Sequence, residues 1–241
     1  MYISQTSKSN IKFVITSKNV NIFKTIWFNF RALPFRSAIK LPFVVGRRVK
    51  ILDIGEIRVK CKIEPAMFTL GVRYNAWETF KESQTVFKNE GTIELNGYTN
   101  FYAGNKIFVA RGANLSFGSY NNIGYKTKII CYKRIEFGNN TGSSWECEFF
   151  DTNFHNMKDI VSNRILKKTA KVVIGDGTFI GNNSSIHKGV RIPPDSIICS
   201  FSRVSGSYAH KGNNLLIQGN PATIADSGYK MLIREFKDYE D

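Results

Sequence analysis

The sequence of 241 residues contains little of what several protein classes require. Its four cysteines form no CxxC pair and no disulfide-like cluster: Cys61, Cys131, Cys147 and Cys199. We therefore expect reduced, mostly buried thiols in a cytosolic protein. Charged residues and prolines interrupt every run of about 20 apolar residues, and the first ten residues are polar. These features argue against a transmembrane span and a cleaved signal peptide.

Histidine is also scarce, with three in the chain: His155, His187 and His210. Their gaps of 32 and 23 residues do not match the three-histidine zinc site of a γ-class carbonic anhydrase, and no other metal motif is present. No Gly-x-Ser-x-Gly motif marks a nucleophilic serine. A metal centre and covalent catalysis are therefore not expected.

The dominant pattern is an aliphatic residue at every sixth position between residues 173 and 205. The series is Ile174, Ile180, Ile186, Ile192, Ile198 and Val204. An amphipathic helix would space its apolar residues three and four apart, and a half-buried strand would alternate them. A period of six predicts a solenoid of short strands and turns with one shared interior. Three such units make one turn of a triangular prism, so residues eighteen apart are expected to stack.

A looser version of the same pattern lies upstream. It runs through Phe117, Ile123, Ile129 and Ile135, slips by two, and continues at Phe137, Ser143 and Phe149. Farther upstream, alternation at residues 56–61 and 92–95 predicts strands of earlier coils. Residues 74–88 show no clear period and receive no assignment.

Three motifs resemble the hexapeptide-repeat acyltransferases. Residues 173–183 (VIGDGTFIGNN) are similar to the last-coil signature of that family, with Phe179 where tryptophan is usual. Residues 217–222 (IQGNPA) are similar to its closing element, and residues 151–155 (DTNFH) resemble the Asp-Ser/Thr-Asp-x-His segment of saccharide O-acetyltransferases. The resemblance covers about residues 91–224. It implies an all-β left-handed parallel β-helix, acetyl-CoA as acyl donor, a saccharide acceptor, and a homotrimer with active sites between subunits.

The resemblance also assigns roles to residues near residue 155. His155 would be the general base, because an imidazole suits proton transfer from a weakly nucleophilic hydroxyl near neutral pH. Asp151 could orient the imidazole, hold acceptor hydroxyls, or serve only a turn. Asn153 stands where saccharide-acetylating relatives often have a second aspartate, so the acceptor contact there is altered.

The family's acetyl-CoA contacts map onto a second group of residues. They fall on Asn182, on Ser200 one coil later, and on Ser205 and Gly206. The spacing of eighteen independently predicts that Asn182 stacks on Ser200. Relatives often have a lysine at the position of Gly206, so the cation that would meet a CoA phosphate is missing there, although Lys211 is near in sequence.

Positive charge is concentrated at the front of the chain. Residues 1–60 hold 12 Lys and Arg against 2 Asp and Glu, within a net charge of +15. Between residues 20 and 45 these cations alternate with bulky apolar residues. Two compatible interpretations remain open: a helical cap on the open end of the solenoid, and an interfacial segment on an anionic membrane. Nucleic acid is not expected, because no nucleic-acid module is present and the cations are dispersed.

These patterns divide the chain into three parts. We expect a basic, aromatic extension over residues 1–45, a β-helix over 46–224 with an extruded loop at about 156–171, and a helical tail over 225–241. The expected function is O-acetylation of a cell-surface glycan in the cytoplasm, with contact to the inner face of the membrane left open. An amino-sugar N-acetyltransferase and a non-catalytic binding scaffold remain as alternatives.

Overall fold

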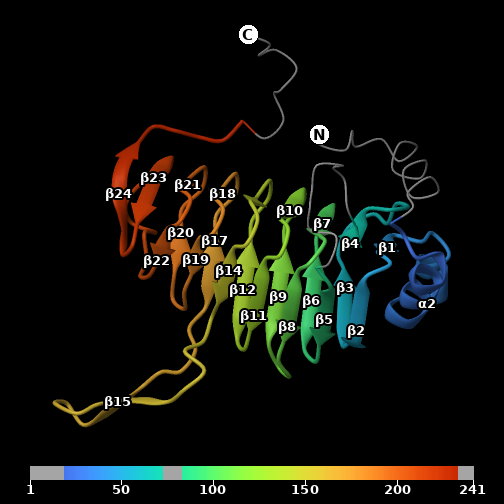
Figure 1. Ribbon diagram of the computed structural model, residues 1–241, viewed down its shortest axis with the longest axis horizontal. Coiled ribbons are helices and arrows are strands. Elements are labelled where there is room, and N and C mark those ends of the chain that lie inside the picture. The colour runs from blue at the N-terminus through green and yellow to red at the C-terminus, as the bar shows by residue number, and fades with distance from the viewer. Residues whose placement is uncertain (1–18, 73–82, 233–241) are drawn as a thin grey trace.

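The computed structural model describes residues 19–72 and 83–232, which form a parallel β-helix capped at its N-terminal end (Figure 1). Three stacked sheets make its walls. The first sheet contains β1 (Phe43–Val45), β4 (Phe68–Val72), β7 (Thr99–Tyr102), β10 (Asn121–Ile123), β13 (Gly142–Ser143), β18 (Phe179–Ile180), β21 (Ile197–Ile198), β23 (Leu215–Gly219) and β24 (Ala222–Ser227). The second contains β2 (Val49–Asp53), β5 (Thr85–Asn89), β8 (Lys106–Val109), β11 (Lys128–Cys131), β14 (Glu148–Phe150), β19 (Ser185–Ile186) and β22 (Arg203–Val204). The third contains β3 (Glu56–Val59), β6 (Thr92–Leu95), β9 (Asn114–Phe117), β12 (Arg134–Phe137), β17 (Val172–Ile174) and β20 (Arg191–Ile192).

The interior is built from the residues of the six-residue repeat. All six aliphatic residues from Ile174 to Val204 are at most 2% exposed. Ile174 pairs with Ile192, and Ile180 pairs with Ile198, in parallel register. The predicted stacking of residues eighteen apart is therefore confirmed for these coils.

The earlier coils are longer than predicted. Ile123 pairs with Phe101 below it and with Ser143 above it, which gives spacings of 22 and 20 residues. The strands here carry two inward residues instead of one, as Ile135 and Phe137 do on β12. The slip by two in the sequence is therefore the ordinary alternation of a single strand.

Close stacking of the coils requires glycine at some corners. A Cβ on Gly124 would lie 2.0 Å from the Ser144 carbonyl oxygen, and one on Gly181 would lie 2.5 Å from the Ser200 backbone nitrogen. Real Cβ atoms do not approach that closely. The glycine that follows the key aliphatic residue thus permits each coil to rest on the next.

Two helices cover the N-terminal end of the solenoid: α2 (Ile22–Ala32) and α3 (Phe35–Ala38). Asn21 caps α2, since its Oδ1 accepts a 2.9 Å hydrogen bond from the Lys24 backbone N–H. The Asn29 side chain both accepts from and donates to the backbone of Phe43 on β1, at 3.0 and 2.8 Å. The helix thus satisfies part of an open sheet edge, which is the predicted capping role. The described helices are too short or too polar to cross a membrane.

One coil is interrupted between β14 and β17. There the chain leaves the prism and forms an antiparallel hairpin of β15 (Met157–Asp159) and β16 (Arg164–Leu166), which projects from the body in Figure 1. The segment predicted as an extruded loop at 156–171 therefore contains regular structure. Its tip is ordered by Asp159, whose Oδ1 accepts hydrogen bonds from the backbone N–H groups of Val161 and Ser162.

The prediction of a helix from residue 225 is wrong for the residues that the structure describes. Residues 222–227 form β24, which pairs antiparallel with β23. Without β24, the last parallel strand would present unpaired N–H and C=O groups, and this edge requirement outweighs the local amphipathic pattern. Residues 233–241 of the predicted tail and most of the unassigned segment 74–88 lie outside the described residues.

The outer faces of the third and second sheets differ in polarity. The third sheet carries ion pairs, including Arg58 with Glu94 at 3.4 Å and Lys60 with Glu94 at 2.8 Å. The outward residues of the second sheet include a half-buried apolar column of Phe108, Ile130 and Phe150. The second sheet also carries an outward ion pair, Lys128 with Glu148 at 2.6 Å, so its surface for a partner is apolar along this column and charged beside it.

Candidate functional site

His155 lies at the corner between the second and third sheets, where the chain leaves β14 to enter the hairpin. Its side chain is exposed. A tight turn holds its backbone: its N–H donates to the Asn153 carbonyl at 2.7 Å, and Phe154 adopts a φ of +62°. The half-buried Asn153 donates its own N–H to the Lys168 carbonyl at 3.0 Å. The imidazole is therefore accessible, while hydrogen bonds hold the backbone that carries it.

Asp151 is four residues away but faces the opposite direction. It is fully buried, and its carboxylate accepts hydrogen bonds of 2.6 to 2.7 Å from the backbone N–H groups of Tyr132, Lys133 and Arg134. The backbone at the corner of the neighbouring coil therefore occupies both carboxylate oxygens. Of the roles considered from sequence, the geometry supports the turn and gives no contact with the imidazole.

Asn182 and Ser200 meet at the corner between the first and second sheets. The Ser200 hydroxyl donates to Asn182 Oδ1 at 2.6 Å, and Ser200 is exposed while Asn182 is half-buried. The corner lies directly after β18 and β21, whose register stacks the two residues. The predicted pair is therefore brought together at an accessible edge.

The other predicted cofactor residues lie elsewhere. Ser205 and Gly206 follow β22 at the corner between the second and third sheets, two coils beyond His155 along the axis. Gly206 has a φ of +92°, and no atom lies near the place where a Cβ would stand. The backbone conformation, rather than a lack of space, therefore favours glycine at this position. Lys211 is exposed in the following turn, where its N–H donates to the Tyr208 carbonyl. Within one protomer the width of the second sheet separates the Asn182 corner from the His155 corner.

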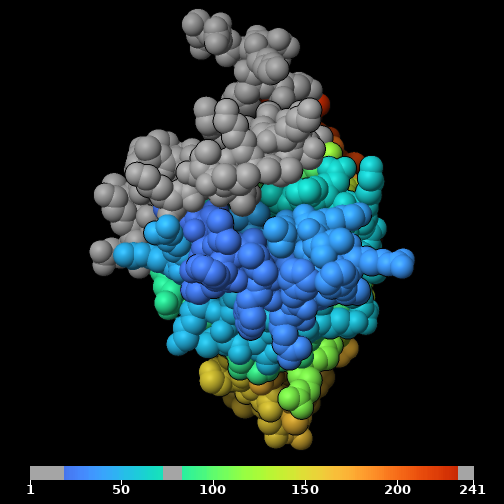
Figure 2. Space-filling view, turned by 90° about the vertical axis from the view of Figure 1, so that its right-hand side faces the viewer, coloured from blue at the N-terminus to red at the C-terminus, as the bar shows by residue number. Residues whose placement is uncertain are grey.

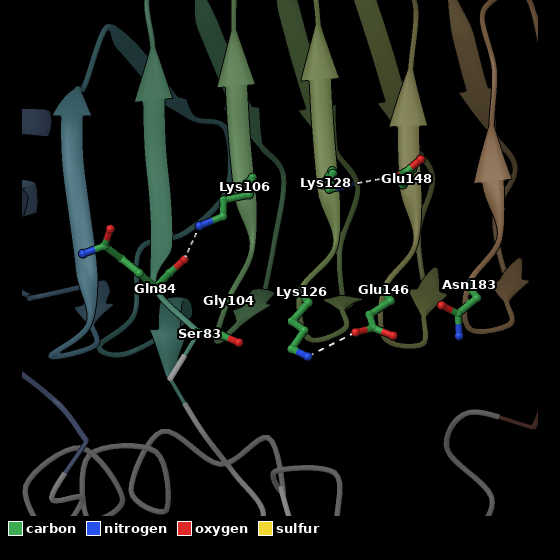
Figure 3. Close-up of a pocket in the computed structure, with 9 residues that line it drawn as sticks. All are labelled: Ser83, Gln84, Gly104, Lys106, Lys126, Lys128, Glu146, Glu148 and Asn183. Carbon is green, nitrogen blue, oxygen red and sulfur yellow. Dashed lines mark hydrogen bonds and ion pairs between the residues drawn. The ribbon is translucent and has the colours of Figure 1, made fainter. Parts of the chain in front are cut away.

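A groove of about 640 Å³ lies along the corner between the first and second sheets, next to Asn182 (Figure 3). Corner residues of five successive coils line it, together with outward residues at the start of second-sheet strands. The lining is Ser83, Gln84, Gly104, Lys106, Lys126, Lys128, Glu146, Glu148 and Asn183. The sequence analysis did not identify this groove.

The charges of the groove are arranged in pairs across neighbouring coils. Lys126 Nζ lies 3.1 Å from Glu146, Lys128 Nζ lies 2.6 Å from Glu148, and Lys106 Nζ donates to the Gln84 carbonyl at 2.7 Å. Alternating ammonium, carboxylate and amide groups suit a ligand with many hydroxyls. The 20-residue spacing within each of the two Lys–Glu pairs is the sequence signal that could have revealed the groove, but reading it requires the true coil length.

The remaining titratable groups of the region are less suited to catalysis. His187 is half-buried and its Nε2 lies 3.2 Å from the Ser185 hydroxyl. Burial, aided by the positive charge of Arg203, lowers the pKa of His187. Burial raises the pKa of the Cys147 thiol to about 12 and also raises the pKa of Cys131. Residues 19–72 and 83–232 hold no group of three His, Cys, Asp or Glu side chains placed to bind a metal.

Comparisons with known proteins agree with this architecture. Residues 171–206 match the family model "Bacterial transferase hexapeptide (six repeats)". No curated protein sequence shows significant similarity to the chain. The crystal structure of the polySia specific acetyltransferase NeuO superposes with a TM-score of 0.57, at 16% identity, over 82% of this chain and 87% of that one.

A further solved structure is AntD, an N-acyltransferase from Bacillus cereus, in complex with dTDP and 3-hydroxybutyryl-CoA. It has 15% identity over 77% of this chain and 80% of that one, with a TM-score of 0.49. The likeness to NeuO concerns the fold, since the sequence identity is low. The chain is thus a left-handed parallel β-helix whose coils at residues 171–206 match the hexapeptide-repeat model.

Proposed function

We propose that the protein is an acetyl-CoA-dependent O-acetyltransferase that acts on a saccharide hydroxyl in the cytoplasm. The observation that carries the proposal is the exposed imidazole of His155, held by a fixed turn at a corner of a hexapeptide-repeat β-helix. The accessible Asn182–Ser200 pair and the fold shared with a polySia specific acetyltransferase support it. Cell-surface glycan synthesis is the proposed setting.

The proposed reaction takes place in one ternary complex. His155 accepts the proton of the acceptor hydroxyl while that oxygen attacks the acetyl carbonyl carbon. The C–S bond of the thioester then breaks, and the departing CoA thiolate takes a proton from the imidazolium. Burial raises the pKa of both Cys131 and Cys147 and suppresses their thiolates, so neither of these thiols is suited to carry the acetyl group.

The proposed active site lies between protomers. In one protomer His155 and the Asn182–Ser200 pair occupy different corners, so a lateral neighbour is needed to bring one corner against the other. We propose that Asn182 and Ser200 bind the CoA moiety, with Ser205, Gly206 and Lys211 toward its phosphate end. The charged groove occupies the coils before Asn182, and we propose that it holds the saccharide.

An acceptor assay tests this function. Purified protein is incubated with acetyl-CoA and with saccharides that differ only in carrying a hydroxyl or an amine at one position, and released CoA thiol is measured. We expect turnover with hydroxyl acceptors and an alkali-labile ester product. Turnover confined to amines would identify an N-acetyltransferase instead, and absence of acetyl-CoA binding by calorimetry would indicate a scaffold.

The quaternary structure gives a separate prediction. We expect a homotrimer, because the apolar column of the second sheet suits burial and the active site needs two protomers. Light scattering should give about 82 kDa, three times the chain mass of 27.4 kDa. A mass of one chain at micromolar concentration would contradict both the trimer and the shared site.

A further inference from the structure

The cap helix α2 has a second apolar face that capping does not use. Its first face is buried: the Thr25 hydroxyl accepts the Val45 N–H at 3.0 Å, and the Phe28 ring packs against Phe43 at 5.1 Å and Phe87 at 5.8 Å between centroids. A helix that only covers a core is polar on its outer side. Here the outer side is apolar instead.

The unused apolar side chains lie together on the end of the solenoid. Phe23 is 85% exposed, Phe35 70% and Trp27 51%. Four more exposed apolar residues belong to the same two helices and the turn after α3: Ile22, Ile26, Phe30 and Ile39. Figure 2 looks onto this end of the molecule, where α2 and α3 are the blue atoms facing the viewer.

The charge around this face has one sign. Residues 19–52 include no aspartate or glutamate. The half-buried Lys24 contributes less to the charge of this surface, because its ammonium group donates a 2.7 Å hydrogen bond to the Val49 carbonyl. Six other cations of this end of the chain are exposed, three on or next to α2 and α3 and three at the start of the first coil: Arg31, Arg36, Lys40, Arg47, Arg48 and Lys50. Among the described residues, no carboxylate forms a salt bridge with any of these six.

We propose that the end face formed by α2 and α3 docks on an anionic lipid membrane. The aromatic and aliphatic side chains would enter the boundary between headgroups and acyl chains, and the cations would meet lipid phosphates. A folded protein partner would need a matching acidic and apolar surface, whereas a bilayer offers both properties over any area. The combination of bulky apolar residues with unopposed cations therefore favours lipid.

The position of the face on the solenoid strengthens the contact. It covers the end of the prism, while a trimer packs its prisms side by side, so the proposed trimer presents three such faces on one side. A flat membrane can then bind all three at once, which raises the overall affinity without any new contact. With about 4.8 Å per coil, the four steps from the coil of β1 to the coil of β14 place His155 roughly 20 Å from the level of β1. The cap helices add their own thickness, about 10 Å, between β1 and the membrane.

The test is co-sedimentation of the full chain with vesicles. One set contains phosphatidylcholine alone, and the other contains phosphatidylcholine mixed with phosphatidylglycerol. Two double variants alter the face: Phe23→Ser with Trp27→Ser, and Arg31→Gln with Arg36→Gln. The matched control is Ile160→Ser with Val161→Ser, which removes two residues of equal or greater exposure (89% and 93%) at the hairpin tip.

We expect wild type and the hairpin control to bind the mixed vesicles, with loss of binding in high salt. Each face variant should bind at least about tenfold more weakly, since each juxtamembrane cation contributes appreciably and the apolar residues supply the insertion. Equal binding to both vesicle types, or wild-type binding by the face variants, would overturn the proposal. The oligomer mass of each protein is measured as well. If wild type is larger than a trimer and the Phe23→Ser/Trp27→Ser variant returns to the trimer mass, a second copy of the chain covers the face, and the proposal is overturned.

Turnover on a soluble acceptor is measured in parallel. The face lies four coils from His155, so this activity should not change in the face variants. Lipid binding and catalysis can therefore fail independently, and the lipid contact of a single cap does not depend on the proposed enzymatic function.

Discussion

Replacing His155 with alanine is expected to lower kcat by about 10² to 10⁴, the usual contribution of a positioned general base. The side chain is exposed, and its turn is held by backbone hydrogen bonds that alanine retains. The folded state, the trimer mass and the affinity for CoA should therefore stay close to wild type. Steady-state kinetics on the true acceptor, with calorimetry for CoA, measures both effects.

The other two histidines are the controls for this experiment. His187→Ala removes a half-buried ring beside Phe150, with centroids 6.2 Å apart, and His210→Ala removes an exposed one. Both should retain most of the turnover. Turnover of His155→Ala within about threefold of wild type would exclude it as the base, and an acetylated enzyme seen by mass spectrometry would exclude the direct mechanism.

The fold could be predicted from the sequence because one buried position recurs in every strand. Ile180 and Ile198 could be paired by counting alone, and the structure has that register. The length of the earlier coils could not be counted, since a strand with two inward residues, such as Ile135 and Phe137, is indistinguishable from a break in the repeat.

Segments without a buried face were harder to predict. The hairpin of β15 and β16 projects from the body, and Ile160 and Val161 at its tip are almost fully exposed, so no burial pattern marks its strands. The C-terminal tail has a helical pattern, yet its start forms β24, because that strand pairs with the otherwise open edge of β23. The charged groove depends on contacts between coils 20 residues apart, which become visible only once the coil length is known.

Asp151 shows a different limit of sequence reasoning. Its place in a saccharide-acetyltransferase motif suggested catalysis, while the structure turns its carboxylate toward the backbone N–H groups of Tyr132, Lys133 and Arg134. A motif identifies the residue type at a position but not the direction of its side chain. Since the Ala170 N–H also donates to the Asp151 carbonyl at 2.9 Å, this residue anchors the start of the hairpin segment to its end.

Asp151→Ala is therefore expected to act mainly on stability. Three backbone N–H groups would lose their acceptor, and each unsatisfied buried donor costs about 1 to 3 kcal/mol. A total loss of roughly 3 kcal/mol or more should lower Tm by about 6 to 12 °C in a chain of this size, measured by calorimetry. Asp151→Asn should be nearly as damaging, because its NH₂ group would face N–H donors.

Asp159→Ala is the matched control, because Asp159 also accepts backbone N–H groups, at 3.0 and 3.2 Å, but at the exposed tip of the hairpin. Water can replace that carboxylate, so its removal should change Tm little. The decisive comparison is between Tm and kcat below the melting range. If Asp151 oriented the imidazole of His155, Asp151→Ala would lose turnover while keeping its Tm, and the anchoring role would be wrong. If Asp151 anchors the corner, Asp151→Ala has a lower Tm. Its turnover then stays close to wild type at low temperature and falls only as the base of the hairpin loosens on warming.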